Sequence, residues 1–204
     1  MITKTQTIHA TFVALALMLL STTTLAANYG GLRGVPTILD KLVATDGAQA
    51  LGAAVLVVDG AEALPFSLAE LLGDKREELV LLAPTNTAFE KLLNLDAGTL
   101  DGMSIDDIQR ELPFLLPPGL GVEDVAAVLL KHAALPRKAN RFTASERALL
   151  AKGELEVADE SVFPVSVGNA GIRINYETSI IEPNVFVRNG VIHFIDTVIT
   201  DSED

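Results

Sequence analysis

The side chains that could carry acid–base or metal chemistry are few in this sequence. Its 204 residues contain three histidines and no cysteine, so thiolate nucleophiles, thiolate metal ligands and disulfides are excluded. Two histidines, His132 and His193, lie beyond the apolar N-terminal stretch. They are far apart in sequence and neither has a second ligand at metal-binding spacing, so no zinc site is predicted.

Two further patterns fall short of a catalytic or metal site. The stretch 102–106, "GMSID", lacks the last glycine of the Gly-x-Ser-x-Gly nucleophile motif. Asp96, Asp101, Asp106 and Asp107 could offer oxygens to a cation, but their spacing does not match a calcium loop. A solvated acidic loop is the favoured interpretation, with weak cation binding as the alternative. The sequence therefore predicts no enzyme, no metal and no cofactor.

The chain is strongly acidic. It has 15 Lys and Arg against 27 Asp and Glu, which gives a formal net charge of −12. A surface of this charge repels nucleic acid and anionic membranes, so we expect no nucleic-acid partner. The charge is compatible with solubility outside the membrane or with attraction to a basic partner.

Residues 1–26 have the composition of a secretory signal peptide. Lys4 gives a positive start, residues 10–20 are apolar, and residues 21–26 end in small side chains. Cleavage is expected after Ala26, with Ala27 as the near alternative; a retained N-terminal tether is the other possibility. We expect export to the periplasm or the cell surface, and no transmembrane span once the signal is removed.

The middle of the chain indicates helices around one buried strand. The continuous apolar run at 79–83 predicts that strand, and the following stretch predicts a helix capped by Thr87 with Glu90, or by Thr85 or Asn86. Further helices are expected over 48–58, which is apolar all round, over 66–72, from Ser104 to just before Pro113, over 122–134 including His132, and from Thr143.

After residue 153 the pattern changes to the two-residue period of strands. Short strands are expected over 155–157, 163–167, 172–176 and 184–187, and Asn189-Gly190 predicts a type I′ turn. That turn would place Val187 opposite Ile192.

This register divides the last hairpin into two apolar faces. The expected core face carries Val185, Val187, Ile192 and Phe194. His193 lies on the other face, which is also apolar, so we interpret it as a structural residue bonded to a backbone carbonyl or a hydroxyl. A hydrolase that uses His193 is a weaker hypothesis.

Three stretches resemble the fasciclin (FAS1) domain. "LVLLAPTNTAFEKL" at 79–92 is similar to its first signature block, "NGVIHFIDTVI" at 189–199 to its second, and "VLLKHAAL" at 128–135 to the helix before a Tyr-His pair. In this chain Lys131 stands in place of that tyrosine, so adhesive roles of the pair are not transferred to His132. The order of the blocks agrees over residues 37–200.

The resemblance implies an α+β fold in one FAS1-like domain, a wedge or sandwich of β-strands with helices packed over one side. A flexible leader, 27–36, would precede the domain and an acidic tail, 201–204, would follow it. It implies a non-catalytic extracytoplasmic module for adhesion, with a protein or glycan of the cell surface as partner. The residues it implies as framework are Pro84, Thr85, Asn86, Phe89, His132, Asn189, Gly190, His193 and Asp196.

The segment 112–120, "LPFLLPPGL", is the one candidate for a contact surface. Its apolar residues Phe114, Leu115, Leu116 and Leu120 either pack on the domain or form an exposed patch. The alternative function is carriage of a small apolar ligand, such as a carotenoid, between this segment and the helix 122–134. The segments 59–78 and 103–122 appear longer than is usual in the family, and we expect them to form surface particular to this chain.

Overall fold

Two strands from distant parts of the chain form the centre of the sheet. The computed structural model describes residues 34–134, 153–169 and 171–200. In it, β1 (Leu79–Pro84) and β7 (Gly190–Ile195) pair in parallel, with Leu79 opposite Gly190 and Pro84 opposite Ile195. Both strands are apolar along nearly their whole length because both of their faces are covered.

The remaining strands extend this pair into one curved seven-stranded sheet. Its order is β2-β1-β7-β6-β5-β4-β3, and every pairing except β1 with β7 is antiparallel. The Ala158 amide, just after β3, donates to the Ala133 carbonyl in β2 at 2.8 Å, so the sheet nearly closes on itself. The other strands are β2 (Ala133–Ala134), β3 (Glu154–Glu156), β4 (Val162–Gly168), β5 (Gly171–Ile174) and β6 (Thr178–Val187).

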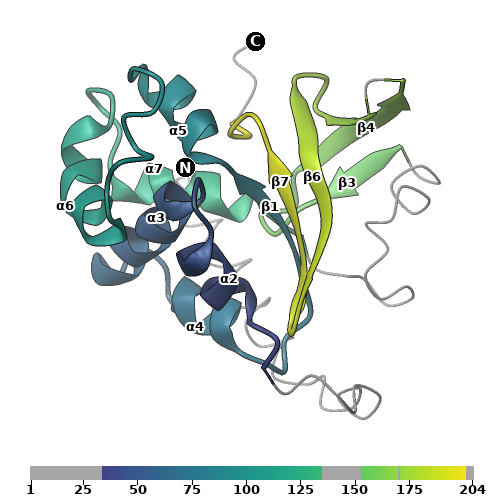
Figure 1. Ribbon diagram of the computed structural model, residues 1–204, viewed down its shortest axis with the longest axis horizontal. Coiled ribbons are helices and arrows are strands. Elements are labelled where there is room, and N and C mark those ends of the chain that lie inside the picture. The colour runs from purple at the N-terminus through teal and green to yellow at the C-terminus, as the bar shows by residue number, and fades with distance from the viewer. Residues whose placement is uncertain (1–33, 135–152, 170, 201–204) are drawn as a thin grey trace, which may run out of the picture.

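The helices lie together on one side of the β1, β7 and β6 strands (Figure 1). Helix α3 is buried along most of its length and packs against the other helices, as its all-round apolar pattern predicts. The described helices are α2 (Ile38–Ala44), α3 (Gln49–Gly60), α4 (Leu68–Gly73), α5 (Asn86–Leu93), α6 (Ile105–Leu115) and α7 (Val122–Leu130). No helix of the described residues is long and apolar enough to cross a membrane.

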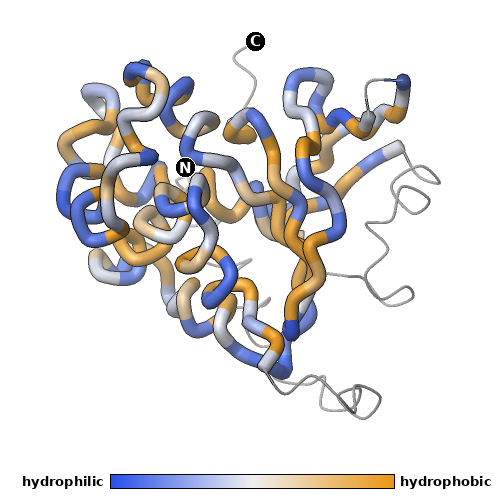
Figure 2. Tube along the Cα trace, in the orientation of Figure 1, coloured by the Kyte–Doolittle hydropathy of each residue, from blue (hydrophilic) through white to orange (hydrophobic). Residues whose placement is uncertain are grey.

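The sheet separates two hydrophobic cores. Alternate residues of β1 point to opposite faces, so Leu81 enters the main core under the helices and Leu82 enters a second core inside the curved sheet. Figure 2 shows hydrophobic colouring along the central strands and on parts of the helices. The second core consists of Leu82, Val157, Phe163, Ile174, Ile195 and Ile199.

The expected register of the last hairpin is wrong by two residues. Val187 lies opposite Gly190 rather than Ile192, and the turn consists of Arg188 and Asn189, neither of which has the positive φ of a type I′ turn. The expected faces are nevertheless correct, because a shift of two residues preserves the side on which each residue points. Val185, Val187, Ile192 and Phe194 all contact the main core.

Helix α5 is capped by Thr85, one of the expected alternatives to Thr87, and the Thr85 side chain accepts from the Ala88 amide. Two other helix boundaries differ from expectation. Helix α6 continues through Pro113 to Leu115. Helix α7 ends at Leu130, so His132 lies in the turn before β2 rather than in the helix.

One expected strand is part of a longer one, and three expected segments are not described by the structure. The strand expected over 184–187 is the end of a longer strand, β6. Three expected segments lie outside the described residues: the signal peptide, the acidic tail and the helix that was expected to begin at Thr143.

We predict that Gly190→Ala destabilises the fold by about 3 kcal/mol or more. A Cβ atom at this position would overlap the Leu79 carbonyl and approach the Ile38 side chain, so β7 could not stay against β1. Gly168→Ala is the matched control, because a Cβ there meets no atom within 4 Å. Denaturant unfolding measures both, and equal losses of stability in the two variants would contradict the close-approach explanation.

Candidate functional site

Asn189 joins three separate segments inside the domain. Its Oδ1 accepts from the Ile38 amide at 2.8 Å, and its Nδ2 donates to the carbonyls of Leu72 at 2.9 Å and Asp74 at 3.0 Å. The side chain is fully buried. Because a buried amide is stable only when its donors and its acceptor are used, this asparagine fixes α2, the end of α4 and the β6–β7 turn together.

The first signature block is held by a second buried amide. Asn86 Oδ1 accepts from the Ala50 amide at 3.0 Å, and Nδ2 donates to Gln49 Oε1 at 2.9 Å and Asp101 Oδ1 at 3.0 Å. The Asn86 amide also donates to the Gly47 carbonyl at 2.7 Å. These contacts fix the start of α5 against α3 and against two loops.

Both ring nitrogens of His132 bind the backbone. Nδ1 faces the Val128 carbonyl at 2.8 Å and therefore donates, while Nε2 accepts from the Ile199 amide at 3.0 Å. These partners fix the neutral tautomer. Burial lowers the pKa of His132 to about 4. The ring connects the end of α7 to the chain after β7 and has no nitrogen left for a substrate.

His193 is also fully buried, in the interior of the curved sheet. Its Nδ1 accepts from the Asn184 amide at 3.2 Å, so the expected partner, a carbonyl or hydroxyl, is wrong. Nε2 has no hydrogen-bond partner among the described residues. Burial lowers the pKa of His193 to about 4.

Asp196 is not an acid–base partner of His193. Its Oδ1 accepts from the Ser179 amide at 2.7 Å and from the Thr197 hydroxyl at 3.2 Å. Pro84 ends β1, and Phe89 packs into the main core from α5. The residues of the two blocks therefore hold different pairs of elements together and do not converge on one catalytic centre.

The four candidate contact residues divide into two kinds. Leu115 and Leu116 pack against the main core. Phe114 near the end of α6 is 83% exposed and Leu120 in the following loop is 50% exposed. The continuation of α6 through Pro113 turns Phe114 outward, so only half of the expected patch is free to meet a partner.

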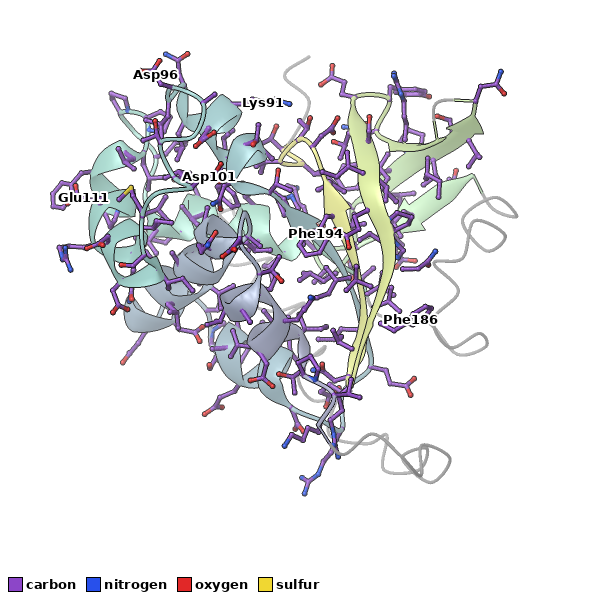
Figure 3. The ribbon with its side chains drawn as sticks, in the orientation of Figure 1. Lys91, Asp96, Asp101, Glu111, Phe186 and Phe194 are labelled. Carbon is purple, nitrogen blue, oxygen red and sulfur yellow. The ribbon has the colours of Figure 1, made fainter. Side chains whose placement is uncertain are left out.

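A groove of about 370 Å³ lies beside the end of β7, and apart from Asp101 none of its lining residues was predicted to bind a ligand. The loop after α2, helix α5, the first half of β6 and the end of β7 form its walls, and Phe194 of β7 is part of the lining. Lys91 in α5 lines it and donates to the Asp196 carbonyl at 3.1 Å. Figure 3 shows Lys91 and Phe194 between the helices and the sheet. Its acidic lining residues are Asp46, Asp101, Glu182 and Asp196.

The acidic loop at 95–107 does not assemble a metal cage. Among the described residues, no three His, Asp or Glu side chains are arranged to hold a metal ion. Asp101 instead accepts from Asn86, and Asp107 forms an ion pair with Arg110 at 3.0 Å on the helix surface. Hydrogen bonds from Ser104 and Arg110 hold the pKa of the Asp107 carboxyl below its usual value.

Residues 65–201, more than half of the chain, match the family model of the fasciclin domain. The chain belongs to the fasciclin domain family. Its fold is similar to that of a solved FAS1 domain pair from the insect cell adhesion molecule fasciclin I, with a TM-score of 0.56 and 16% identity over 82% of this chain and 52% of that one. At this identity the likeness shows the fold alone, and this chain spans about half of the domain pair. No curated protein matches it in sequence.

One departure of this fasciclin domain from the family pattern has a structural use. Lys131, which stands where the resemblance expects tyrosine, is buried and donates to Asp159 Oδ2 at 2.8 Å. The ion pair links the end of α7 to the turn that follows β3. This position therefore stabilises the nearly closed sheet and is not part of an exposed motif.

Asn189→Ala should lower the free energy of unfolding of this fasciclin domain by about 3 kcal/mol, because it leaves three buried backbone groups without a partner. Asn189→Asp should be at least as harmful at neutral pH. It retains an acceptor for the Ile38 amide but directs a carboxylate at the carbonyls of Leu72 and Asp74. Chemical denaturation measures both; an aspartate variant as stable as the wild type would show that the two donor contacts are unimportant.

Acid should destabilise the domain through its buried histidines. The pKa values of His132 and His193 are about 4 in the fold and about 6.5 in an unfolded chain. Their contribution is thus complete above pH 6.5 and decreases as the pH falls towards 4, by on the order of 3 kcal/mol per histidine. His193→Leu should remove about half of this histidine-dependent loss in unfolding experiments across that pH range. A variant with the pH dependence of the wild type would contradict this account.

Proposed function

We propose that this chain is an extracytoplasmic, non-catalytic binding module that attaches to a protein or glycan at the cell surface. The observation that carries the proposal is how the polar side chains of the family motifs are used. Asn86, His132 and Asn189 are buried, and their polar atoms are bonded within the chain. Groups that a hydrolase would present to a substrate are occupied in holding the fold, which favours a role in binding.

Two further observations support this role. Fasciclin domains are modules of cell adhesion that generally work outside the cell, and the similar insect structure belongs to an adhesion molecule. The N-terminal 26 residues have the pattern of an export signal. Export of this chain to the periplasm or the cell surface is part of the proposal.

Phe114 and Leu120 are the proposed contact residues of one surface. Exposed aromatic side chains at the centre of a contact contribute a large share of binding energy, because they bury much apolar area with little loss of rotamer freedom. Carriage of an apolar ligand by the same segment has less support. Leu115 and Leu116 already pack on the main core and would have to leave it to line a ligand site.

Cross-linking in the native envelope tests the proposal. We expect the full chain, tagged and exported by its own host, to form a discrete cross-linked product with an envelope component. Phe114→Ser combined with Leu120→Ser should reduce that product at least fivefold. The matched control is Val162→Ser with Tyr176→Ser, which removes two comparably exposed side chains from β4 and from the β5–β6 turn and should leave the product unchanged.

The outcomes separate the hypotheses. An equal reduction of the cross-linked product by both double variants would show non-specific apolar contact and overturn the proposed surface. Absence of any specific product, together with a co-purifying apolar molecule in the mass spectrum of an organic extract, would replace the binding module with the carrier.

A further inference from the structure

We infer that the groove between α5, the first half of β6 and the end of β7 binds a long basic side chain, lysine or arginine, presented by a protein partner. The inference rests on the proposed function, since it names the chemistry of one partner contact. It concerns a surface distinct from Phe114 and Leu120. The groove combines an apolar base, fixed walls and a negative rim, and each feature selects the same kind of ligand.

The base of the groove suits an aliphatic stem. Phe194 lines the groove opposite Glu182 of β6, but it is only 4% exposed, so the apolar surface open to a ligand comes mainly from Ile181. Ile181 lines the same groove and is 55% exposed. Lysine and arginine side chains carry three or four methylene groups that pack on apolar surface while the charged end reaches polar groups. An inorganic cation would gain nothing from these two residues.

The rim carries negative charge that the described residues do not neutralise. Asp46, Asp101 and Glu182 are exposed side chains of the groove lining. Arg110 pairs with Asp107 and Lys131 pairs with Asp159, and neither ion pair involves a residue of the groove lining. Lys91 is the basic residue of the lining and donates to a backbone carbonyl. Carboxylates therefore outnumber ammonium groups, and a cationic partner would complement them.

The walls are fixed before any ligand arrives. The Asn86 amide holds the Gly47 carbonyl, and its side chain holds Asp101. The Asp196 side chain is tied to the Ser179 amide. A binding site whose groups are already positioned loses less conformational entropy when the ligand binds. The rim carboxylates on these loops are thus placed by buried contacts of the fold.

The probe for this site is a fluorescein-labelled octalysine peptide, and fluorescence anisotropy with the full chain measures its Kd at low salt. Asp46→Asn with Glu182→Gln should raise the Kd at least fivefold. The control, Asp96→Asn with Glu111→Gln, removes the same net charge from exposed positions away from the groove (Figure 3) and should raise it less than twofold. Ile181→Ser should raise the Kd about threefold, and Lys91→Gln should lower it.

Two results of the peptide experiment would overturn the inference. One is no binding of octalysine at 20 mM salt; the other is an equal rise in Kd for the two double variants, which would mean that the peptide responds to the overall charge. Thermal unfolding of each variant shows whether it is folded at the temperature of the binding measurement.

The envelope cross-link then separates this inference from the proposed function. Loss of the cross-link in the Asp46 and Glu182 double variant supports both the groove as a contact and the proposed binding function. A cross-link that persists in that variant leaves the binding module standing and overturns the groove as its contact. Groove-dependent peptide binding without any envelope partner would overturn only the proposed function.

Discussion

The pairing of β1 with β7 at the Asn189 corner is the constraint on which the rest of the structure depends. It joins segments separated by more than a hundred residues, and Asn189 then fixes that junction to α2 and to the end of α4 through buried hydrogen bonds. Gly190 permits the contact because the Leu79 carbonyl occupies the space that a Cβ would need. Without this corner the helices and the sheet would have no shared interior, since β1 reaches the sheet only through β7 and the two-residue strand β2.

Burial of this strand pair on both faces explains where the polar residues of the family motifs are found. A central parallel pair needs apolar cover on each side, so the polar side chains attached to it are drawn into the interior, where they persist only with partners. Asn189 and His132 find theirs in backbone groups of neighbouring segments. Within the described part of the chain, His193 has one hydrogen-bond partner, the Asn184 amide at the irregular part of β6, and burial keeps its ring neutral. The burial that stabilises the fold therefore also removes these residues from the surface.

Elements whose sequence pattern is local could be predicted from the sequence. The hairpin register, the end of α6 and the groove could not, because they depend on tertiary contacts. The apolar run of β1, the all-round apolar α3 and the two faces of the last hairpin follow from periodicity. The hairpin register does not, because Asn189 forms buried bonds with Leu72 and Asp74 that outweigh its turn preference. Helix α6 passes through Pro113 since Leu112 and Leu115 pack on the core on either side of it. The groove was not predicted, because its lining comes from two loops, α5, β6 and β7, which meet only in the folded chain.

The groove is a consequence of the same strand pairing. Two parallel strands end at the same edge of a sheet, so the chain leaves β1 at Thr85 and β7 at Asp196 side by side, and both residues line the groove. Helix α5 must begin at this edge because it follows β1 directly, and Asn86 anchors there the loop that carries Asp101. The irregular pairing of β6 places Glu182 opposite Phe194, which adds a carboxylate beside an apolar base. The fold thus uses the polar residues of its motifs internally and still presents a charged groove, in which Asp46 and Asp101 lie on exposed loops outside the core.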